Sequence, residues 1–426
     1  MFSRSRPSYA MPRPSLRKRW RGLFQGWQSL DWLLLLLPVA VTIFGSVVIG
    51  STQRHNGDPG FAINHLILGG LSLPITLWIA RCRYRIFFQW RWVIYAVTNL
   101  SLIAVMVMGT SGLGAQRWIP IAGFNVQPSE FAKLGLIITL AATLKDRDGS
   151  TLPGLCKALA ITAVPWALVF LQPDLGTSLV FGAITLGMLY WSNTNPGWLV
   201  LMMSPLVAAI LFHLSLPTWM AWVGLMGLVA WRTLPWPLFS TVAAVGVNLV
   251  AGQLGNLLWG LLKDYQKDRL ILFLDPDKDP LGGGYHLIQS RIAIGAGELW
   301  GRGLYQGTQT QLSFIPEQHT DFIFSAVGEE LGFIGAIGLL TAFWLICLRL
   351  IAIAQRAQDN FGSLLAIGVL SMIVFQVVVN ICMTIGLAPV TGIPLPWMSY
   401  GRSALLTNFI ALGLVESVAN HRPRRR

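Results

Sequence analysis

Three ionisable residues lie directly before a long apolar run. Glu317, His319 and Asp321 alternate within the stretch FIPEQHTDFIFSAVGEELGF, residues 314–333, and the apolar run continues to about residue 348. Carboxylates and histidines are the side chains that most often transfer protons in enzymes. Ionisable groups at membrane depth are costly, so they are by default candidates for a functional site. This stretch therefore predicts a chemically active site at the edge of a membrane span.

Further ionisable residues gather near the ends of other apolar runs. Glu130 and Lys133 stand three residues apart at the expected start of a helix, so their side chains face the same way as an ion pair. Inside a span, that pair would present its charges to a polar cavity and not to lipid. Solvation at the membrane surface explains any one such residue about equally well, but the set as a whole favours a functional site. Its other members are Arg117, Asp174, Arg291, Glu298, Glu329 and Glu330.

The composition sets the class of protein. Of the 426 residues, 54% are hydrophobic and 12% are charged, whereas about a quarter are charged in an average soluble domain. The sequence therefore predicts an integral membrane protein. Its formal charge of +13 comes from short basic clusters between apolar runs, a pattern typical of cytoplasmic loops, so we infer no nucleic-acid partner. The four cysteines have no metal-ligand spacing and are interpreted as free thiols.

Twelve apolar runs are about long enough to cross a bilayer as helices. The first run follows a basic segment and has no small-residue cleavage site after it, so it predicts a span and not a signal peptide. Counting from a cytoplasmic N-terminus, every strong Arg/Lys cluster but one falls on the cytoplasmic side. The runs lie near residues 30–50, 65–80, 92–108, 131–144, 157–171, 176–192, 198–213, 217–231, 236–262, 323–348, 361–386 and 403–420.

The chain is interpreted as an all-α, polytopic membrane protein with about twelve transmembrane helices. Basic cytoplasmic tails occupy residues 1–29 and 421–426, and the membrane domain occupies residues 30–420. Within it, residues 192–262 hold three crossings, and residues 263–320 form a large extracytoplasmic loop that contains the one basic cluster outside the charge pattern. A loop this long inside a compact protein is usually functional or disordered, and its apolar, glycine and aromatic content argues against disorder.

Five segments resemble the signatures of a known family. They are RWIPIAGFNVQPSEFAKL, QPDLGTS, DPDKDPLGGGYHLIQSRIAIGAG, GTQTQLSFIPEQHTDFIFSAVGEELG and GLAPVTGIPLPWMSYGRSALL. In this order they look like the SEDS proteins, the RodA/FtsW group, which polymerises bacterial cell-wall glycan. The match covers residues from about 30 to 420 except 192–262. GYHLIQS and GTQTQ resemble the elongation member, RodA, more than the division member, FtsW.

Three features depart from the family pattern. The family usually has ten spans, so two of the three crossings within 192–262 are interpreted as an insertion. The usual SYGGS reads SYGRS, which places Arg402 in a turn, and a usual glycine pair reads GELWG, which introduces Glu298. Both departures leave the local substrate contacts at these positions open.

The resemblance implies a peptidoglycan glycosyltransferase that polymerises lipid II at the outer face of the bacterial cytoplasmic membrane during elongation. A sugar 4-hydroxyl attacks the anomeric carbon of the growing chain and expels undecaprenyl pyrophosphate. On this basis Asp321 is the candidate general base, and Arg117 and Lys133 are candidates for binding the pyrophosphate. The other expected substrate-binding residues are Glu130 and Asp174, which would orient these cations, and Glu317 and His319, which would neighbour the base.

The sequence leaves the basicity of Asp321 open. Its apolar neighbours Phe322, Ile323 and Phe324 would raise the pKa of the carboxyl group, whereas a helix N-terminus and His319 would lower it. Glu329, about two turns along the same helix, is expected to face elsewhere and to matter least for the reaction.

The resemblance also implies a partner, a single-pass class B penicillin-binding protein of the elongation cell-wall complex. Small apolar faces of the spans near 323–386 are the expected docking surface. No cofactor is assigned. A divalent cation, Mg²⁺ or Mn²⁺, is compatible with a pyrophosphate leaving group, although the sequence has no ligand spacing for one.

Two other hypotheses place the protein in cell-wall synthesis without glycosyltransferase chemistry. A lipid II flippase would carry the same ligand, but carriers keep their substrate site near the membrane midplane between repeats, whereas the ionisable residues here gather at one face. A non-catalytic scaffold of a cell-wall complex would leave Asp321 and Lys133 unexplained.

Overall fold

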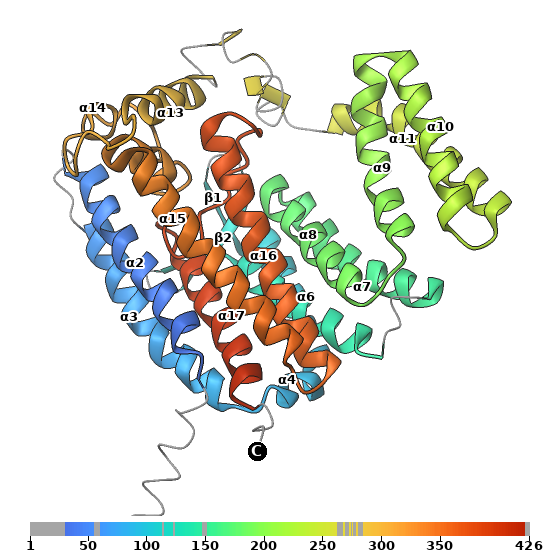
Figure 1. Cartoon of the computed structure of the whole chain (residues 1–426), viewed down its shortest axis with the longest axis horizontal. Coiled ribbons are helices and arrows are strands. Elements are labelled where there is room, and N and C mark those ends of the chain that lie inside the picture. The colour runs from blue at the N-terminus through green and yellow to red at the C-terminus, as the bar shows by residue number, and fades with distance from the viewer. Residues whose placement is uncertain are drawn as a thin grey trace, which may run out of the picture.

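The computed structural model describes residues 30–54, 60–112, 115–121, 124–146, 151–261, 267–268, 272–273, 275, 278–279 and 284–421. Helices dominate this part of the chain (Figure 1). The long helices are α2 (Trp32–Gln53), α3 (Gly60–Arg81), α5 (Arg91–Met108), α6 (Pro128–Leu144), α7 (Leu152–Leu171), α8 (Leu175–Trp191), α9 (Pro196–Leu214), α10 (Leu216–Thr233), α11 (Pro237–Leu261), α15 (Ile323–Gln355), α16 (Asn360–Ile385) and α17 (Arg402–Asn420). The short helices are α4 (Arg85–Gln89), α13 (Tyr285–Ala296) and α14 (Thr308–Gln311).

Each of the twelve predicted apolar runs lies on a different long helix. Within the described residues, nine helices are long and apolar enough to cross a membrane, and α8 is a shorter apolar helix of 17 residues. The prediction of a polytopic helical membrane protein is therefore confirmed. The count of twelve spans stays a prediction, because α6, α8 and α10 fall outside the set of nine.

Local sequence signals define where several helices begin and end. Asp31, Thr151, Asp174 and Asp359 precede α2, α7, α8 and α16, and each accepts a hydrogen bond from a backbone N–H of the first turn. Such caps satisfy donors that a helix leaves unpaired at its N-terminus. At the other end of α16, Gly386 has φ 81°, a left-handed conformation that glycine adopts without a steric penalty.

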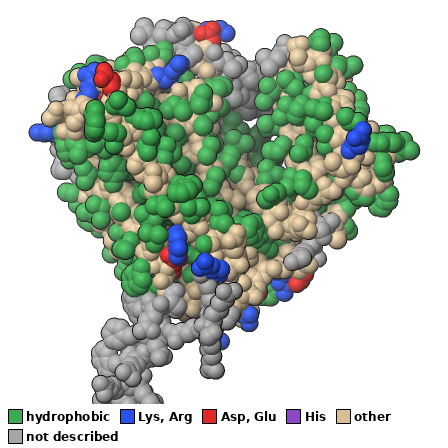
Figure 2. All heavy atoms as spheres, viewed as in Figure 1, with side chains coloured by type: hydrophobic (Ala, Val, Ile, Leu, Met, Phe, Trp, Pro, Cys, Tyr) green, Lys and Arg blue, Asp and Glu red, His purple; other side chains and the backbone are tan. Residues whose placement is uncertain are grey.

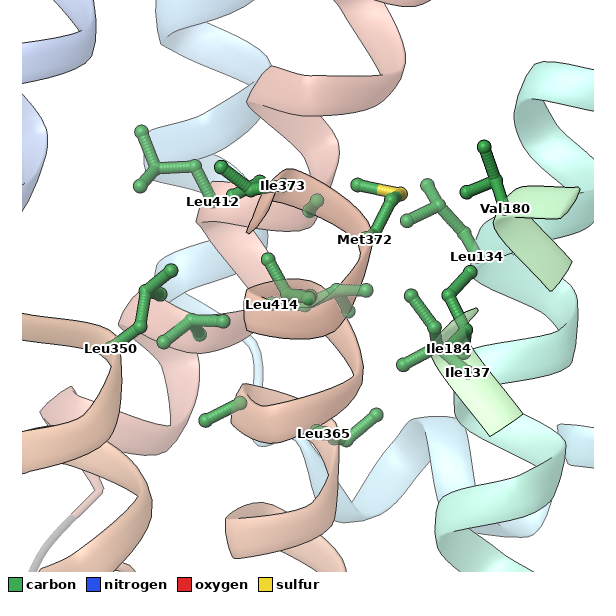
Figure 3. Packing of buried hydrophobic residues seen from close by; sticks show 14 of the residues in the cluster. Leu134, Ile137, Val180, Ile184, Leu350, Leu365, Met372, Ile373, Leu412 and Leu414 are labelled. Carbon is green, nitrogen blue, oxygen red and sulfur yellow. The ribbon is translucent and has the colours of Figure 1, made fainter. Parts of the chain in front are cut away.

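Helix α6 lies at the centre of the bundle. Every residue of α6 except Phe131 is buried, and the helix packs against α5, α7, α8, α16 and α17. Figure 3 shows Leu134 and Ile137 among buried side chains that include Val180 and Ile184 of α8. Because protein and not lipid surrounds α6, ionisable residues on this helix meet other side chains.

Helices α9–α11 form a three-helix unit beside the rest of the bundle (Figure 1). These three helices contact one another extensively, while α9 joins the unit to α8. The side chain of Asn195 donates to the carbonyl of Thr233 at 2.7 Å, so the start of α9 and the end of α10 lie together. Figure 2 shows hydrophobic side chains over most of the visible face, with charged side chains mostly near its upper and lower margins.

Outside the three-helix unit, five long helices begin at one end of the bundle. We call this the upper end, where α14 lies in Figure 1. Helices α3, α6, α8, α15 and α17 start here, and contacts described below tie their first residues together. Each helix N-terminus carries a partial positive charge from its aligned peptide dipoles, so the upper end favours negative charge.

A small sheet lies between α5 and α6 and was not predicted from the sequence. It has the order β1 (Thr110–Gly112), β2 (Ala115–Ile121), β3 (Phe124–Val126), and both pairings are antiparallel. Strand β2 contacts α5 and α6, and β3 contacts α17. The predicted basic tail 1–29 and residues 422–426 lie outside the described residues, as does most of 262–283.

Candidate active site at the upper end

The backbone of Asp321 is held just before α15 begins. The side-chain amide of Asn380, on α16, donates to the carbonyl of Asp321 at 2.8 Å and to that of Ile393 at 2.8 Å. The next residue, Phe322, is 3% exposed, whereas Asp321 itself is half-buried. Asp321 thus lies where the buried first residues of α15 meet the more exposed segment that precedes them. The role expected of its carboxylate stays a prediction.

His319 packs against two aromatic rings. Its ring centroid lies 4.9 Å from that of Phe61, at the start of α3, and 5.9 Å from that of Tyr400, before α17. The backbone N–H of Tyr400 donates to the carbonyl of His319 at 2.9 Å. Burial lowers the pKa of His319, and the nearby charge of Glu317 opposes this effect. Because the ordinary histidine pKa is about 6.5, an imidazole with a lowered pKa is neutral at pH 7.

Glu317 forms a local turn. Its side chain is exposed, its φ is 54°, and it accepts a hydrogen bond from the hydroxyl of Thr320 at 3.0 Å. The carbonyl of Glu317 accepts from the N–H groups of Thr320 and Phe322. Glu317 therefore shapes the turn that leads to Asp321.

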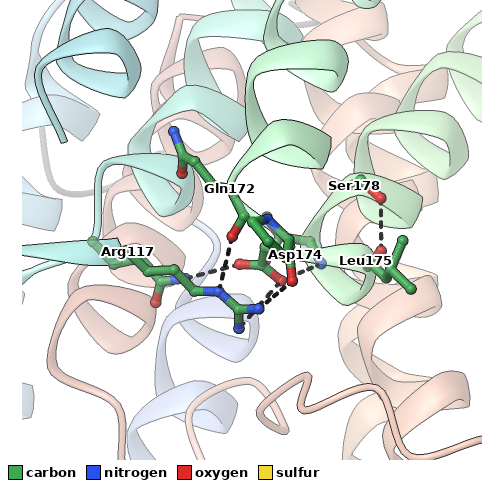
Figure 4. A network of polar contacts seen from close by, with 8 residues as sticks. Arg117, Gln172, Asp174, Leu175 and Ser178 are labelled. Carbon is green, nitrogen blue, oxygen red and sulfur yellow. Dashed lines mark hydrogen bonds and ion pairs between the residues drawn. The ribbon is translucent and has the colours of Figure 1, made fainter. Parts of the chain in front are cut away.

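Arg117 and Asp174 come together at the start of α8 (Figure 4). The guanidinium of Arg117, on β2, lies 3.9 Å from the carboxylate of Asp174 and also donates to the carbonyls of Gln172 and Pro173. Asp174 accepts from the N–H of Thr177 at 3.2 Å and from its hydroxyl at 2.9 Å. The carboxylate thus caps α8 and helps to fix the position of the Arg117 side chain.

Glu130 and Lys133 form the ion pair that their spacing predicts. The ammonium of Lys133 donates to both carboxylate oxygens of Glu130 at 2.8 Å, in the first turns of α6. Lys133 is 1% exposed and Glu130 is 3% exposed. The pair is therefore packed inside the bundle, beneath the helix N-termini, and not presented at the surface.

Three residues that the sequence did not single out join these elements. The N–H of Gln127 donates to the hydroxyl of Ser403 on α17 at 2.9 Å, and its side-chain amide lies 3.4 Å from Asp174. Tyr400 links the segment before α15 to α3, because its ring meets Phe61 edge-on at 4.9 Å. The available signal was weak: Gln127 precedes a proline at the first position of a helix, and Ser403 opens an apolar run.

Arg402, the departure in SYGRS, lies at this end of the bundle. It is the first residue of α17, and its guanidinium Nε donates to the hydroxyl of Tyr400 at 3.0 Å. The substitution therefore adds a cation next to the ring that contacts His319.

The expectation that Glu329 matters least for the reaction stays a prediction, but the structure gives this residue contacts that were not foreseen. Glu329 is fully buried and accepts hydrogen bonds from the N–H groups of Gln309 and Thr310, both at 2.8 Å, and from the hydroxyl groups of Thr308 and Thr310. Helical periodicity gave the direction of the side chain but not the loop that folds over it. Glu329 therefore holds residues 308–310 against α15 at the upper end.

The described residues contain no group of three or more His, Cys, Asp or Glu side chains arranged to hold a metal ion. Mg²⁺ at phosphate sites commonly uses one or two carboxylates, with phosphate oxygens and waters as the other ligands. The described part of the chain therefore offers single carboxylates and not a cage of protein ligands.

Comparison with known proteins finds relatives along nearly the whole chain. A family model described as a cell cycle protein, FtsW/RodA/SpoVE, matches residues 28–222 and 198–424. The peptidoglycan glycosyltransferase MrdB of Escherichia coli K12 is 36% identical over 394 residues, which cover 92% of this chain and 94% of MrdB. The peptidoglycan glycosyltransferase RodA of Treponema pallidum is 34% identical over 426 residues, covering 92% and 98%.

Solved structures give the same result for the fold. A chain from a peptidoglycan synthase complex, described as coordinating polymerization and crosslinking, matches with a TM-score of 0.71 and 29% identity over 93% of this chain and 99% of that one. The rod shape determining protein RodA of Thermus thermophilus matches with a TM-score of 0.62 and 26% identity over 93% and 98%. The family model also matches the α9–α11 region, because its two matched ranges together cover residues 28–424.

Proposed function

The chain belongs to the family of FtsW, RodA and SpoVE cell-cycle proteins, and from this premise we propose how its residues carry out glycan polymerisation. It is a multi-pass helical membrane protein and a peptidoglycan glycosyltransferase of the elongation type. The substrate is lipid II, and the upper end of the bundle faces the outside of the cytoplasmic membrane.

Asp321 is the general base of this reaction. The carboxylate accepts the proton of the sugar 4-hydroxyl while that oxygen bonds to the anomeric carbon of the growing chain. The bond from the anomeric carbon to the pyrophosphate breaks, and its electron pair stays on the pyrophosphate oxygen. The observation that carries this assignment is the placement of Asp321, half-buried beside buried Phe322 and held through its backbone by Asn380.

The leaving pyrophosphate gains negative charge, and the upper end supplies positive potential to stabilise it. The N-termini of α6, α8 and α17 meet through Gln127, and Arg117 adds a guanidinium that is about a quarter exposed (23%). Lys133 lies deeper and is paired with Glu130, so it acts on the potential of the site more than as a first contact. Mg²⁺ or Mn²⁺ would accompany the pyrophosphate, whose oxygens supply most of the ligands.

Asp321→Asn tests the base. The amide keeps the size of the carboxyl group but cannot accept a proton, so polymerisation should fall by the ~10²–10⁴ typical of a lost general base. Binding of lipid II and the melting temperature in detergent should stay near those of the original protein. The assay measures glycan polymer from labelled lipid II, with the partner protein present.

Glu317→Gln is the matched control, because Glu317 is an exposed carboxylate four residues away. It should retain most activity, since an amide can still accept from Thr320. Near-normal polymerisation by a well-folded Asp321→Asn protein would remove Asp321 from the mechanism. Failure of the original protein to make polymer with any partner would favour the flippase.

The orientation of the chain has its own test. Single cysteines at Gly60, where α3 begins, and at Gln358, between α15 and α16, lie at opposite ends of the bundle. An impermeant thiol reagent added to whole cells should label the first and not the second. In the three-helix unit, Ser215 should label and Arg232 should not, as expected for three separate crossings.

A class B penicillin-binding protein is the proposed partner, supported by the similarity to a chain from a synthase complex. Helix α15 exposes apolar side chains along one face at Phe333, Ile337, Leu340 and Trp344. This face suits a single transmembrane helix of the partner. Ile337 lies within this face and is 45% exposed, so Ile337→Trp should block association, measured by co-purification, without unfolding the helix.

A further inference from the structure

The segment before Asp321 has an unusually strained backbone. Of the eight non-glycine residues with positive φ in the described chain, four fall between 298 and 317: Glu298 (47°), Tyr305 (63°), Ser313 (54°) and Glu317 (54°). Each left-handed residue costs roughly 1–2 kcal/mol relative to an ordinary conformation. Such residues persist only where surrounding contacts fix them. We call residues 297–320 the entry loop, and three groups of contacts fix its conformation.

The first part of the entry loop closes a break in α15. Gly332 has φ 64°, so the helix loses hydrogen bonds around it. The N–H groups of Arg302 and Gly303 donate to the carbonyls of Glu329 and Glu330 at 3.0 and 2.9 Å. In return, the N–H groups of Phe333 and Ile334 donate to the carbonyls of Glu298 and Leu299. The loop backbone thus satisfies the helix groups that the break exposes.

The side chain of Glu329 holds the middle of the entry loop. Both of its oxygens are used, Oε1 by the N–H of Gln309 and Oε2 by the N–H and hydroxyl of Thr310. The carboxylate is fully buried, so these hydrogen bonds are not exchanged with water. A buried carboxylate on two backbone donors forms charge-assisted hydrogen bonds, which are stronger than neutral ones.

Glu330 and two glutamines tie the same loop to the end of α2. The hydroxyl of Ser51 donates to Glu330, and the amide of Gln311 donates to the carbonyl and hydroxyl oxygens of Ser51 at 3.1 Å. Further on, the amide of Gln318 donates to the carbonyls of Thr52 at 2.8 Å and Thr310 at 3.1 Å. Gln318 is three residues from Asp321, so these contacts reach almost to the base.

We propose that Glu329 is a positioning residue for Asp321: with Glu330 as a second anchor, it clamps the strained entry loop against α15 and α2 and so sets where the carboxylate of Asp321 lies. This inference rests on the proposed role of Asp321 as the base. Glu329 touches no reacting atom. It acts because a misplacement of about 1 Å at a reacting group can cost about 10²-fold in rate.

The two adjacent glutamates provide a matched pair. Glu329→Gln replaces one acceptor oxygen by an NH₂ group, which then faces an N–H donor of Gln309 or Thr310, so one anchor is lost. Glu330→Gln keeps an oxygen for Ser51, and the other oxygen of Glu330 has no hydrogen-bond partner, so its clamp contact survives. Glu298→Gln, an exposed carboxylate of the same loop, is the surface control.

The kinetic test measures kcat and KM for polymer formation from lipid II. Glu329→Gln should lower kcat by about 10²-fold with little change in KM, because substrate binding does not need the base in place. Glu330→Gln should lose much less and Glu298→Gln nothing. In an Asp321→Asn background, Glu329→Gln should cause no further loss, because the two residues act through one function. An equal, additive loss in both backgrounds would overturn the proposal.

Hydrogen exchange supplies a readout that does not depend on activity. Glu329→Gln should speed exchange of the amides from 306 to 320, while the core helices α6 and α16 keep their protection. Unchanged exchange in this segment, or equally faster exchange throughout the chain, would contradict a local clamp. If Asp321→Asn proves active, the proposed base fails, yet the exchange result still decides whether Glu329 holds the loop.

Discussion

The upper end of the bundle and the three-helix unit are both built from apolar helices, yet they hold their polar residues in opposite ways. At the upper end, Lys133 and Glu130 are buried as an ion pair, and Asp174 and Glu329 each accept several hydrogen bonds. Left-handed residues cluster in the entry loop. In the three-helix unit, a buried polar contact between two helices is a neutral one, from the amide of Asn248 on α11 to the hydroxyl of Ser204 on α9 at 2.9 Å.

This difference separates a region built for chemistry from a region built for packing in lipid. Buried charges and left-handed residues each lower stability unless neighbouring groups compensate for them. Lipid-facing helices need only satisfied backbones and close packing. The upper end therefore carries the costly features, which is the arrangement expected of an active site, and the three-helix unit should tolerate substitutions that the upper end does not.

The largest effect should follow removal of one partner of the buried ion pair. Lys133→Ala leaves the carboxylate of Glu130 charged and unpaired inside the bundle, which costs about 3–5 kcal/mol of stability. The measurement is the thermal unfolding of each variant in detergent, reported as its melting temperature. A loss below about 1 kcal/mol would mean that water reaches Glu130 and that the upper end is less closed than its packing indicates.

The double variant Glu130→Gln with Lys133→Met separates the structural role of this pair from its electrostatic role. Stability should return, because neutral side chains of similar size replace the ions. If polymerisation stays low in the refolded protein, the positive charge serves the substrate. If stability and polymerisation both return, the ion pair is structural only. The buried charges of the upper end would then not distinguish it from the three-helix unit in function.

Much of the difference between the upper end and the three-helix unit was predictable from the sequence, because it depends on residues that are close together in the chain. Apolar runs predict helices, since a helix satisfies its own backbone in lipid. The ion pair of Glu130 and Lys133 follows from i, i+3 spacing. Asp174 precedes α8 as a cap residue and thereby holds Arg117 close.

What could not be predicted depends on contacts far apart in the chain. Gln127 meets Ser403 across 276 residues, and Ser51 meets Glu330 across 279. The contacts of Glu329 could not be predicted either, because a helical pattern gives the direction of a side chain and does not show that a loop folds back over it. The left-handed conformations in the entry loop could not be predicted either. Among these residues only Gly301 and Gly303 are glycines, the residue type that commonly adopts this conformation.

A smaller effect is expected in the three-helix unit. Asn248→Leu removes the hydrogen bond to Ser204 and should cost at most about 1 kcal/mol, because hydrogen bonds between membrane helices are worth about 0.6 kcal/mol on average. Polymerisation should not change. A loss of activity without unfolding would show that this unit contributes to the reaction and would contradict the division of roles.

The strain in the entry loop predicts a stabilising substitution. Glu298 has φ 47° and an exposed side chain, and it stands where the family resemblance implies a glycine. Glu298→Gly removes a left-handed penalty of about 1 kcal/mol, although the extra freedom of glycine in the unfolded chain offsets part of it. The melting temperature should rise slightly. The neighbouring exposed Leu299, whose φ is not positive, is the control, and Leu299→Gly should destabilise.

The smallest effect is a pH dependence that originates at the upper end. Burial lowers the pKa of His319, so between this lowered value and the ordinary value near 6.5 the unfolded chain binds a proton that the folded chain does not. The free energy of unfolding should therefore decrease as the pH falls below about 6.5. His319→Gln should flatten this slope in melting temperatures measured between pH 5 and pH 8, a window set around the unperturbed histidine pKa of about 6.5. Phe61→Ala, which uncovers the ring, should reduce the slope without abolishing it. An unchanged slope in both variants would place the titrating group elsewhere and would show that the aromatic contacts of His319 do not exclude water.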